Sequence, residues 1–224
     1  MAITAAQVKE LREMTGAGMM DCKKALTKTE GDMDAADEFL RENGLAKAAK
    51  KAGRIAAEGL VAVALSEDAK EAAIVEVNSE TDFVAKNDTF KAYVAEVADQ
   101  ALTTAAADIE GFLAEDSKAE AGKTVKEALD GKIAVIGENL NIRRFAKVSA
   151  ADGFVASYIH AGGKIGVLVE ADAQANETVE ASMKTIAMQI AAMSPQYISR
   201  EDISDDELAK MREITIDSAL NDVA

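Results

Sequence analysis

The 224-residue sequence contains one histidine, one cysteine and no tryptophan, which excludes several kinds of site at once. The single cysteine, Cys22, rules out an internal disulfide and a cysteine-rich zinc site. Ser-His-Asp or Cys-His catalysis would have to use His160, and there is no nucleophile elbow of the Gly-x-Ser-x-Gly kind. We therefore expect a protein that is not an enzyme and that needs no metal or cofactor of its own.

Long hydrophobic runs are missing as well. No stretch approaches the roughly 18 consecutive apolar residues of a membrane-spanning helix. No N-terminal segment combines a charged start with a long apolar run, as a secretory signal would. These absences predict a soluble, cytoplasmic protein with no membrane partner.

Positive charge is scarce, and its distribution is uneven. The net charge of −15 argues against direct contact with nucleic acid, whose phosphates require a basic surface. Residues 1–54 hold 10 Lys+Arg against 9 Asp+Glu, whereas residues 55–224 hold 15 against 31. A nearly neutral head followed by an acidic body indicates at least two functional segments.

The head, residues 1–54, begins with two short helices. In the first, Val8, Leu11 and Met14 share one apolar stripe. A glycine-rich break then leads to a second helix at about residues 19–27.

A third helix is centred on residues 36–40, and Asn43 with Gly44 is expected to close it. Residues 45–54 then read as a basic helical linker to the next domain. Three helices in so few residues make a bundle with a thin core, which presents a surface rather than a cavity.

The body contains the same pattern twice. Each copy reads as strand, turn, strand and helix, which predicts two small antiparallel sheets, each covered on one face by its helix. The resulting fold class is α+β with a duplicated ββα core. The two copies comprise residues 59–65, 73–77 and 90–102, and residues 153–159, 165–170 and 179–193.

Two segments between and within these copies need separate interpretation. Residues 105–130 form an acidic, alanine-rich helical stretch, and residues 141–148 alternate like a strand that we expect in the second sheet. The sequence Gly162-Gly163-Lys164 resembles part of a phosphate-binding loop but lacks its first glycine. A hairpin turn between two strands is the better interpretation.

A final helix opens at Ser204, whose capping box includes Glu207, and runs to about Leu220. Its apolar stripe could pack on the core or associate with a second copy of the chain, and the sequence favours neither. The predicted units are residues 1–54 (head and linker), 55–140 (first core subdomain), 141–200 (second core subdomain) and 201–224 (C-terminal helix).

Some apolar side chains are expected at the surface. Phe83 follows Asp82 in a turn directly after the predicted strand at residues 73–77, where chain reversal would direct the ring outward. The ring could enter a partner's pocket, or it could cap the local core. Met19 and Met20 are adjacent on one helix and cannot both face inward, so at least one is available for contact.

Over residues 8–221 the sequence resembles the elongation factor Ts family, the bacterial guanine-nucleotide exchange factors for elongation factor Tu. The motifs that carry the resemblance are LREMTGAGMMDCKKAL at 11–26, KAAKKA at 47–52, NSETDFVA at 78–85, IGEN at 136–139, IRR at 142–144, and His160 with GVLV at 166–169. The resemblance implies a ubiquitin-associated-like three-helix head and a core of two related subdomains.

The resemblance also implies a role for individual residues. The head would contact the nucleotide-binding domain of elongation factor Tu, the Asp-Phe pair would enter near its bound magnesium, and the histidine would approach its phosphate-binding loop. The factor would act on magnesium and GDP that the partner holds, and would need no cofactor. The residues implied in partner binding and nucleotide release are Arg12, Met19, Met20, Thr81, Asp82, Phe83, Val84 and His160.

Family members continue beyond the position of Asn221 with a helical hairpin, strands and a terminal helix, and the closing residues 222–224 do not follow that pattern. We therefore expect the second subdomain to lack part of its cover. The alternative to an exchange factor is then a fragment that docks on elongation factor Tu without promoting exchange.

Overall fold

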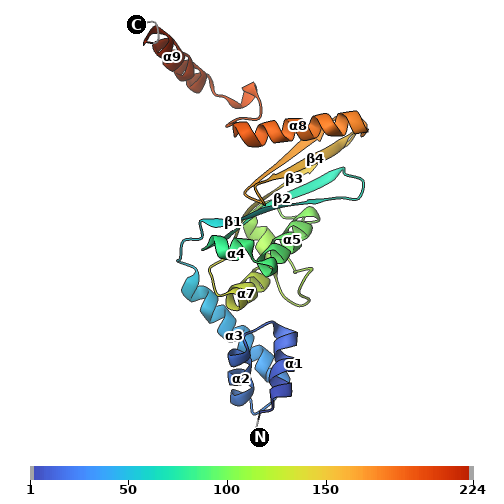
Figure 1. Ribbon diagram of the computed structural model, residues 1–224, viewed down its shortest axis with the longest axis vertical. Coiled ribbons are helices and arrows are strands. Elements are labelled where there is room, and N and C mark those ends of the chain that lie inside the picture. The colour runs from blue at the N-terminus through green and yellow to red at the C-terminus, as the bar shows by residue number, and fades with distance from the viewer. Residues whose placement is uncertain (1–2, 222–224) are drawn as a thin grey trace.

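The computed structural model describes residues 3–221 and is elongated (Figure 1). A three-helix head lies at one end, packed sheets and helices form the middle, and a single helix projects at the other end. The head consists of α1 (Ala5–Thr15), α2 (Met19–Lys28) and the first part of α3 (Met33–Lys51). The predicted three-helix head is therefore present.

Helix α3 is longer than predicted. The expected end at Asn43 and Gly44 is wrong, because α3 continues without interruption to Lys51 and includes most of the predicted linker. Gly44 is buried, and a Cβ atom at that position would lie 3.3 Å from the Cβ of Ala134. This glycine therefore permits close packing of two helices instead of ending one.

The first sheet contains three antiparallel strands in the order β1-β2-β3: β1 (Glu58–Leu65), β2 (Glu71–Ser79) and β3 (Asn141–Ser149). Our placement of residues 141–148 in the second sheet is wrong, because β3 pairs with β2, with Val75 opposite Phe145. The reason is burial: Ile142 on β3 is 1% exposed in the core of the first sheet, and Phe145 packs against the same core.

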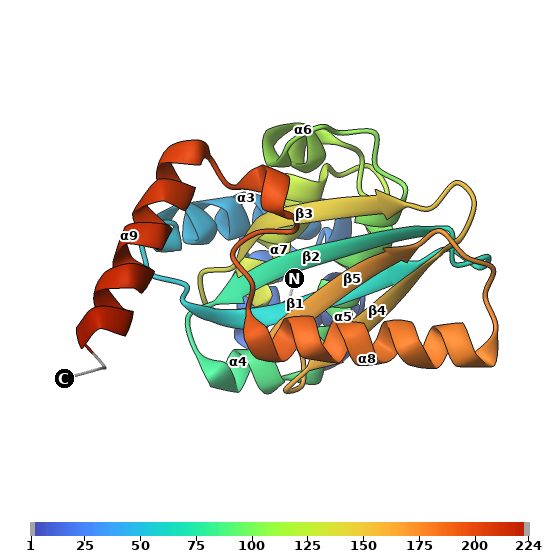
Figure 2. The ribbon, with the colours of Figure 1, turned by 90° about the horizontal axis from the view of Figure 1, so that it is seen from above.

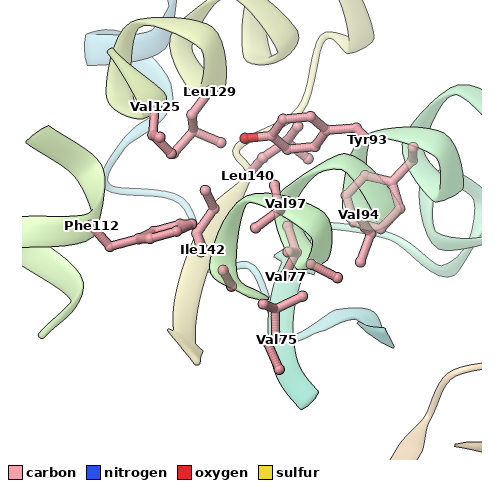
Figure 3. Close-up of a cluster of buried hydrophobic side chains, with 14 of the residues drawn as sticks. Val75, Val77, Tyr93, Val94, Val97, Phe112, Val125, Leu129, Leu140 and Ile142 are labelled. Atoms are coloured by element: carbon pink, nitrogen blue, oxygen red, sulfur yellow. The ribbon is translucent and has the colours of Figure 1, made fainter. Parts of the chain in front are cut away.

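Helices α4 (Asp82–Lys86), α5 (Asp88–Leu102), α6 (Ile109–Ala114) and α7 (Val125–Ile136) complete this unit. Figure 3 shows side chains from β2, β3, α5, α6 and α7 meeting in one hydrophobic core. The acidic stretch predicted as helical at residues 105–130 is helical only in α6 and the start of α7. Between them, Thr124 caps α7 through a capping box with Glu127 and forms a β-bridge with Asp116.

The second sheet consists of β4 (Phe154–His160) and β5 (Ile165–Ala171), which are antiparallel, and α8 (Glu177–Met193) packs on it. The strand-turn-strand-helix order thus occurs twice, which confirms the predicted α+β class and the duplication. Figure 1 shows α8 and α5 on opposite sides of the two packed sheets. The turn between β4 and β5 contains Gly162 and Gly163, so the hairpin interpretation is confirmed.

After a short 3-10 helix, η1 (Arg200–Asp202), the chain forms α9 (Asp205–Asn221), which begins at the predicted cap. No side chain of α9 is buried, and Figures 1 and 2 show the helix projecting from the body. Within residues 3–221, α9 therefore does not pack on the core, and its association with a second copy stays a prediction. The predicted C-terminal unit also includes residues 222–224, which lie outside the described residues.

Among the residues that the structure describes, no helix is long and apolar enough to cross a membrane. The predicted unit boundaries at residues 54, 140 and 200 stay predictions.

Phe112 offers a test of the core. Its side chain is 0% exposed, and its ring centroid lies 5.1 Å from that of Phe145. Phe112→Ala should lower the free energy of unfolding by about 3–5 kcal/mol, because it removes buried apolar area and leaves a cavity. Urea denaturation measures the loss. The control is Phe83→Ala, at a ring that is 82% exposed, which should change stability by less than about 0.5 kcal/mol. Equal losses in the two variants would contradict this description of the core.

Candidate partner-binding site

Among the aromatic residues of the first sheet and its helices, Phe83 is the most exposed. It is the second residue of α4, the short helix that connects β2 to α5. Val84 and Ala85 pack toward the core, whereas the Phe83 ring is 82% exposed. The interpretation of Phe83 as a cap on the local core is therefore wrong, and the predicted outward direction is confirmed. An isolated ring held at the surface is suited to inserting into a partner.

The turn before α4 is fixed by hydrogen bonds to a second turn, which follows α7. Thr81 donates from its backbone N to Glu138 Oε2 (3.0 Å) and from its Oγ1 to Glu138 Oε1 (2.6 Å). Glu80 Oε1 accepts from the backbone N of Asn139 (2.6 Å). Sequence reasoning identified Glu138 and Asn139 only as part of a motif and gave them no role, because their partners are more than 50 residues away.

Asp82 carries a stabilised negative charge beside the ring. Its Oδ2 lies 2.6 Å from Lys86 Nζ, one helical turn along α4. This hydrogen bond, together with the attraction of the same ammonium group and of Lys164, holds the pKa of Asp82 below its ordinary value. The pair likewise raises the pKa of Lys86. At neutral pH the surface around Phe83 therefore presents an ionised carboxylate that forms an ion pair with Lys86.

His160 is exposed at the end of β4, immediately before the hairpin turn. Its Nδ1 lies 2.8 Å from Tyr158 Oη, and this contact orients the imidazole. Its exposure leaves the imidazole accessible to a partner.

The hairpin turn that follows His160 is docked on β1. The carbonyl of Gly163 accepts from the backbone N of Val61 (2.7 Å), and Lys164 Nζ lies 2.5 Å from Glu58 Oε2. Gly163 has a φ of +100°, which residues with a side chain rarely adopt, and a Cβ atom there would push Leu60 Cδ2 (2.9 Å away) aside, so glycine is the favoured residue in this docked turn.

Helix α4 also packs on β1. Figures 1 and 2 both show the β4–β5 turn beside α4, so the end of β4 that carries His160 lies near the helix that carries Phe83.

The head residues form a separate group. Arg12 is exposed on α1, and Met19 and Met20 on α2 are 58% and 74% exposed, so both methionines are available for contact. Met14 is 62% exposed, which corrects its assignment to the buried stripe of Val8 and Leu11. Figure 1 places this group at the far end of α3 from α4, so the predicted site residues form two patches.

Within residues 3–221, no three His, Cys, Asp or Glu side chains are arranged to hold a metal ion. Burial, reinforced by Glu120 and Glu96, raises the pKa of Tyr93 far above its ordinary value. Tyr93 lies in the core beneath α7 (Figure 3), so this shift reflects packing and not a reactive cleft.

Comparison with known proteins gave consistent matches. Residues 80–223 match the family model described as Elongation factor TS. The chain is 54% identical to elongation factor Ts of Trichlorobacter lovleyi, over 96% of this chain and 70% of that protein. It is 54% identical to that of Clostridioides difficile (98% and 72%) and 50% identical to that of Halothermothrix orenii (99% and 74%).

The Asp82–Lys86 pair predicts a measurable pH effect. In Lys86→Met the pKa of Asp82 should rise toward its ordinary value, because the cation that stabilises the carboxylate is lost. In the wild type, the stabilising contribution of the pair is present above the ordinary pKa of Asp and is lost as the pH falls through the lowered one. Carboxyl-carbon NMR titration measures this pKa. An unchanged value in Lys86→Met would show that the pair does not form in solution.

Proposed function

The chain belongs to the elongation factor Ts family, and we propose that it binds elongation factor Tu loaded with GDP and promotes GDP release during translation elongation. Membership in the family makes the chain a translation elongation factor; guanine-nucleotide exchange is the specific activity that we propose. The observation that carries this proposal is Phe83, an aromatic ring that is 82% exposed on a short helix fixed to the core. A fragment that only docks would not need the Asp82–Phe83 pair together with His160.

The proposed mechanism is differential binding and involves no chemical step. A factor that releases GDP must bind the nucleotide-free partner more tightly than the loaded one, because only a difference in affinity shifts the equilibrium. Insertion of the Phe83 ring would displace elements of the partner around its magnesium ion. The area that the ring buries on insertion provides favourable free energy for this displacement.

The polar residues beside the ring would act on the partner's phosphate region. Asp82 would bring a carboxylate close to the magnesium that holds the GDP phosphates, and loss of magnesium contacts removes much of the phosphate binding. His160 ends β4 next to the turn that lies beside α4, and it would approach the phosphate-binding loop. Magnesium and GDP both belong to the partner, so the chain itself would need no cofactor.

The head would supply affinity. Arg12, Met19 and Met20 are exposed at the opposite end of α3, and methionine side chains adapt readily to a partner surface. Two patches on one chain would contact the same partner, so docking by the head would raise the local concentration of Phe83 at its target. Elongation factor Tu acts in the cytoplasm, which is where we place the chain.

The direct test is the rate at which fluorescently labelled GDP leaves elongation factor Tu when this 224-residue chain is added. An exchange factor should accelerate release in proportion to its concentration until the partner is saturated. Binding without acceleration, measured on the same samples by calorimetry, would instead establish the alternative of a docking fragment.

Phe83→Ala tests the role of the ring. The variant should lose at least tenfold in the saturating release rate, equivalent to about 1.4 kcal/mol, because the apolar area that enters the partner is removed. The matched control is Ile198→Ala, which removes a fully exposed apolar side chain far along the sequence and should leave the rate unchanged. A wild-type rate in Phe83→Ala would exclude displacement of the partner's elements by the ring.

A further inference from the structure

We propose that Glu138 is a positioning residue: its carboxylate fixes the N-terminus of α4 and thereby sets the direction in which Phe83 projects. This inference rests on the proposed exchange function for its activity readout. Its structural content can be tested on the isolated chain.

The geometry of the carboxylate is specific to this task. Each oxygen of Glu138 accepts one hydrogen bond from Thr81, Oε2 from the backbone N (3.0 Å) and Oε1 from Oγ1 (2.6 Å). Thr81 Oγ1 in turn accepts from the backbone N of Val84 (3.3 Å) and so caps α4. The carboxylate therefore orients the hydroxyl group that caps the helix. Hydrogen bonds to a charged acceptor are stronger than those between neutral groups.

Helix α4 needs such support because it is short and weakly buried. It has five residues, fewer than an isolated helix needs to be stable in water. Ala85 is its only buried side chain, and Phe83 itself is exposed. Besides the packing of Val84 and Ala85, the direction of the ring therefore depends on how the helix begins, at Thr81.

The turn that carries Glu138 is itself held firmly. It follows α7, which is anchored in the core by Leu129 and Ile133. On the other side of Glu138, Asn139 donates from its backbone N to Glu80 Oε1 (2.6 Å) and from its Nδ2 to the carbonyl of Arg54 (2.8 Å). Rigidity is thus transmitted from the core through this turn to Thr81 and α4.

The chain contains a closely matched control. Glu115 accepts from Thr104 Oγ1 (2.7 Å) and from the backbone N of Ala105 (3.2 Å), which is a similar glutamate–threonine contact. It lies beyond the C-terminal end of α5, whereas α4 precedes the N-terminal end of the same helix. The 15 residues of α5 separate the two sites by about 22 Å along its axis. Loss of either contact should affect stability similarly, but only Glu138 should affect Phe83.

The experiment compares Glu138→Ala with Glu115→Ala in two assays. Amide hydrogen exchange, measured by NMR on the chain alone, should accelerate at least tenfold at Thr81 and Val84 in Glu138→Ala only. Amides of Val94 and Val97 in α5 should keep their wild-type rates. The saturating rate of labelled GDP release should fall about tenfold in Glu138→Ala and stay at the wild-type value in Glu115→Ala.

A double variant separates positioning from a general loss of structure. If Glu138 acts through the ring, Glu138→Ala should cause less than a twofold further loss when Phe83 is already alanine. A further loss as large as in the wild-type background would overturn the proposal. Unchanged exchange of the Thr81 amide would also overturn it, whatever the GDP assay shows.

A conservative variant keeps the result interpretable. Glu138→Gln retains one accepting oxygen and should give intermediate rates of Thr81 amide exchange and of GDP release, even if the alanine variant folds poorly. If the alanine variant is unfolded and the Thr81 amide of Glu138→Gln exchanges at the wild-type rate, the result would count against the proposal. If the wild-type chain does not accelerate GDP release from elongation factor Tu, the proposed function fails. Amide exchange on the chain alone then decides whether Glu138 positions α4.

Discussion

Burial of β2 on both faces is the constraint on which the rest of the structure depends. Ala73, Val75 and Val77 of this strand enter the core beneath α5, whereas Ala72 packs with Val155 in the cluster between the sheets. The strand ends at Ser79, which is 0% exposed, so the chain leaves the core at a defined point. Asp82 and Phe83, the pair that we propose to act next to the partner's magnesium, follow within four residues of that point.

In the mechanism that we propose, the site acts by holding exposed groups in fixed directions and carries out no reaction. An exposed aromatic ring and a carboxylate lie on α4, an imidazole lies near that helix at the end of β4, and the head contributes a second contact patch at the other end of α3. These groups can act on the partner only if their directions are maintained while the partner changes shape. Any free energy needed to order them on binding would lower the affinity. The hydrogen bonds at Thr81 and the docking of Gly163 on β1 maintain those directions.

Local patterns in the sequence predicted much of this arrangement. The duplicated strand-turn-strand-helix order, the cap at Ser204 and the outward direction of Phe83 all follow from spacing and turn chemistry. The errors concern long-range packing. Strand β3 pairs with β2 because its apolar side chains meet Phe112, and Gly44 lies within α3 because α7 packs against it. The hydrogen bonds between Glu138 and Thr81 join segments that are 57 residues apart, and no local pattern reveals them.

Thermodynamic linkage provides the most direct test of the central claim that this chain acts by differential binding. If the chain weakens GDP binding to elongation factor Tu, then GDP must weaken binding of the chain by the same factor. Calorimetry should therefore compare the affinity of the chain for nucleotide-free and for GDP-loaded elongation factor Tu. We expect tighter binding to the nucleotide-free form, by the same factor by which the chain lowers the partner's affinity for GDP. Equal affinities for the two forms would contradict it.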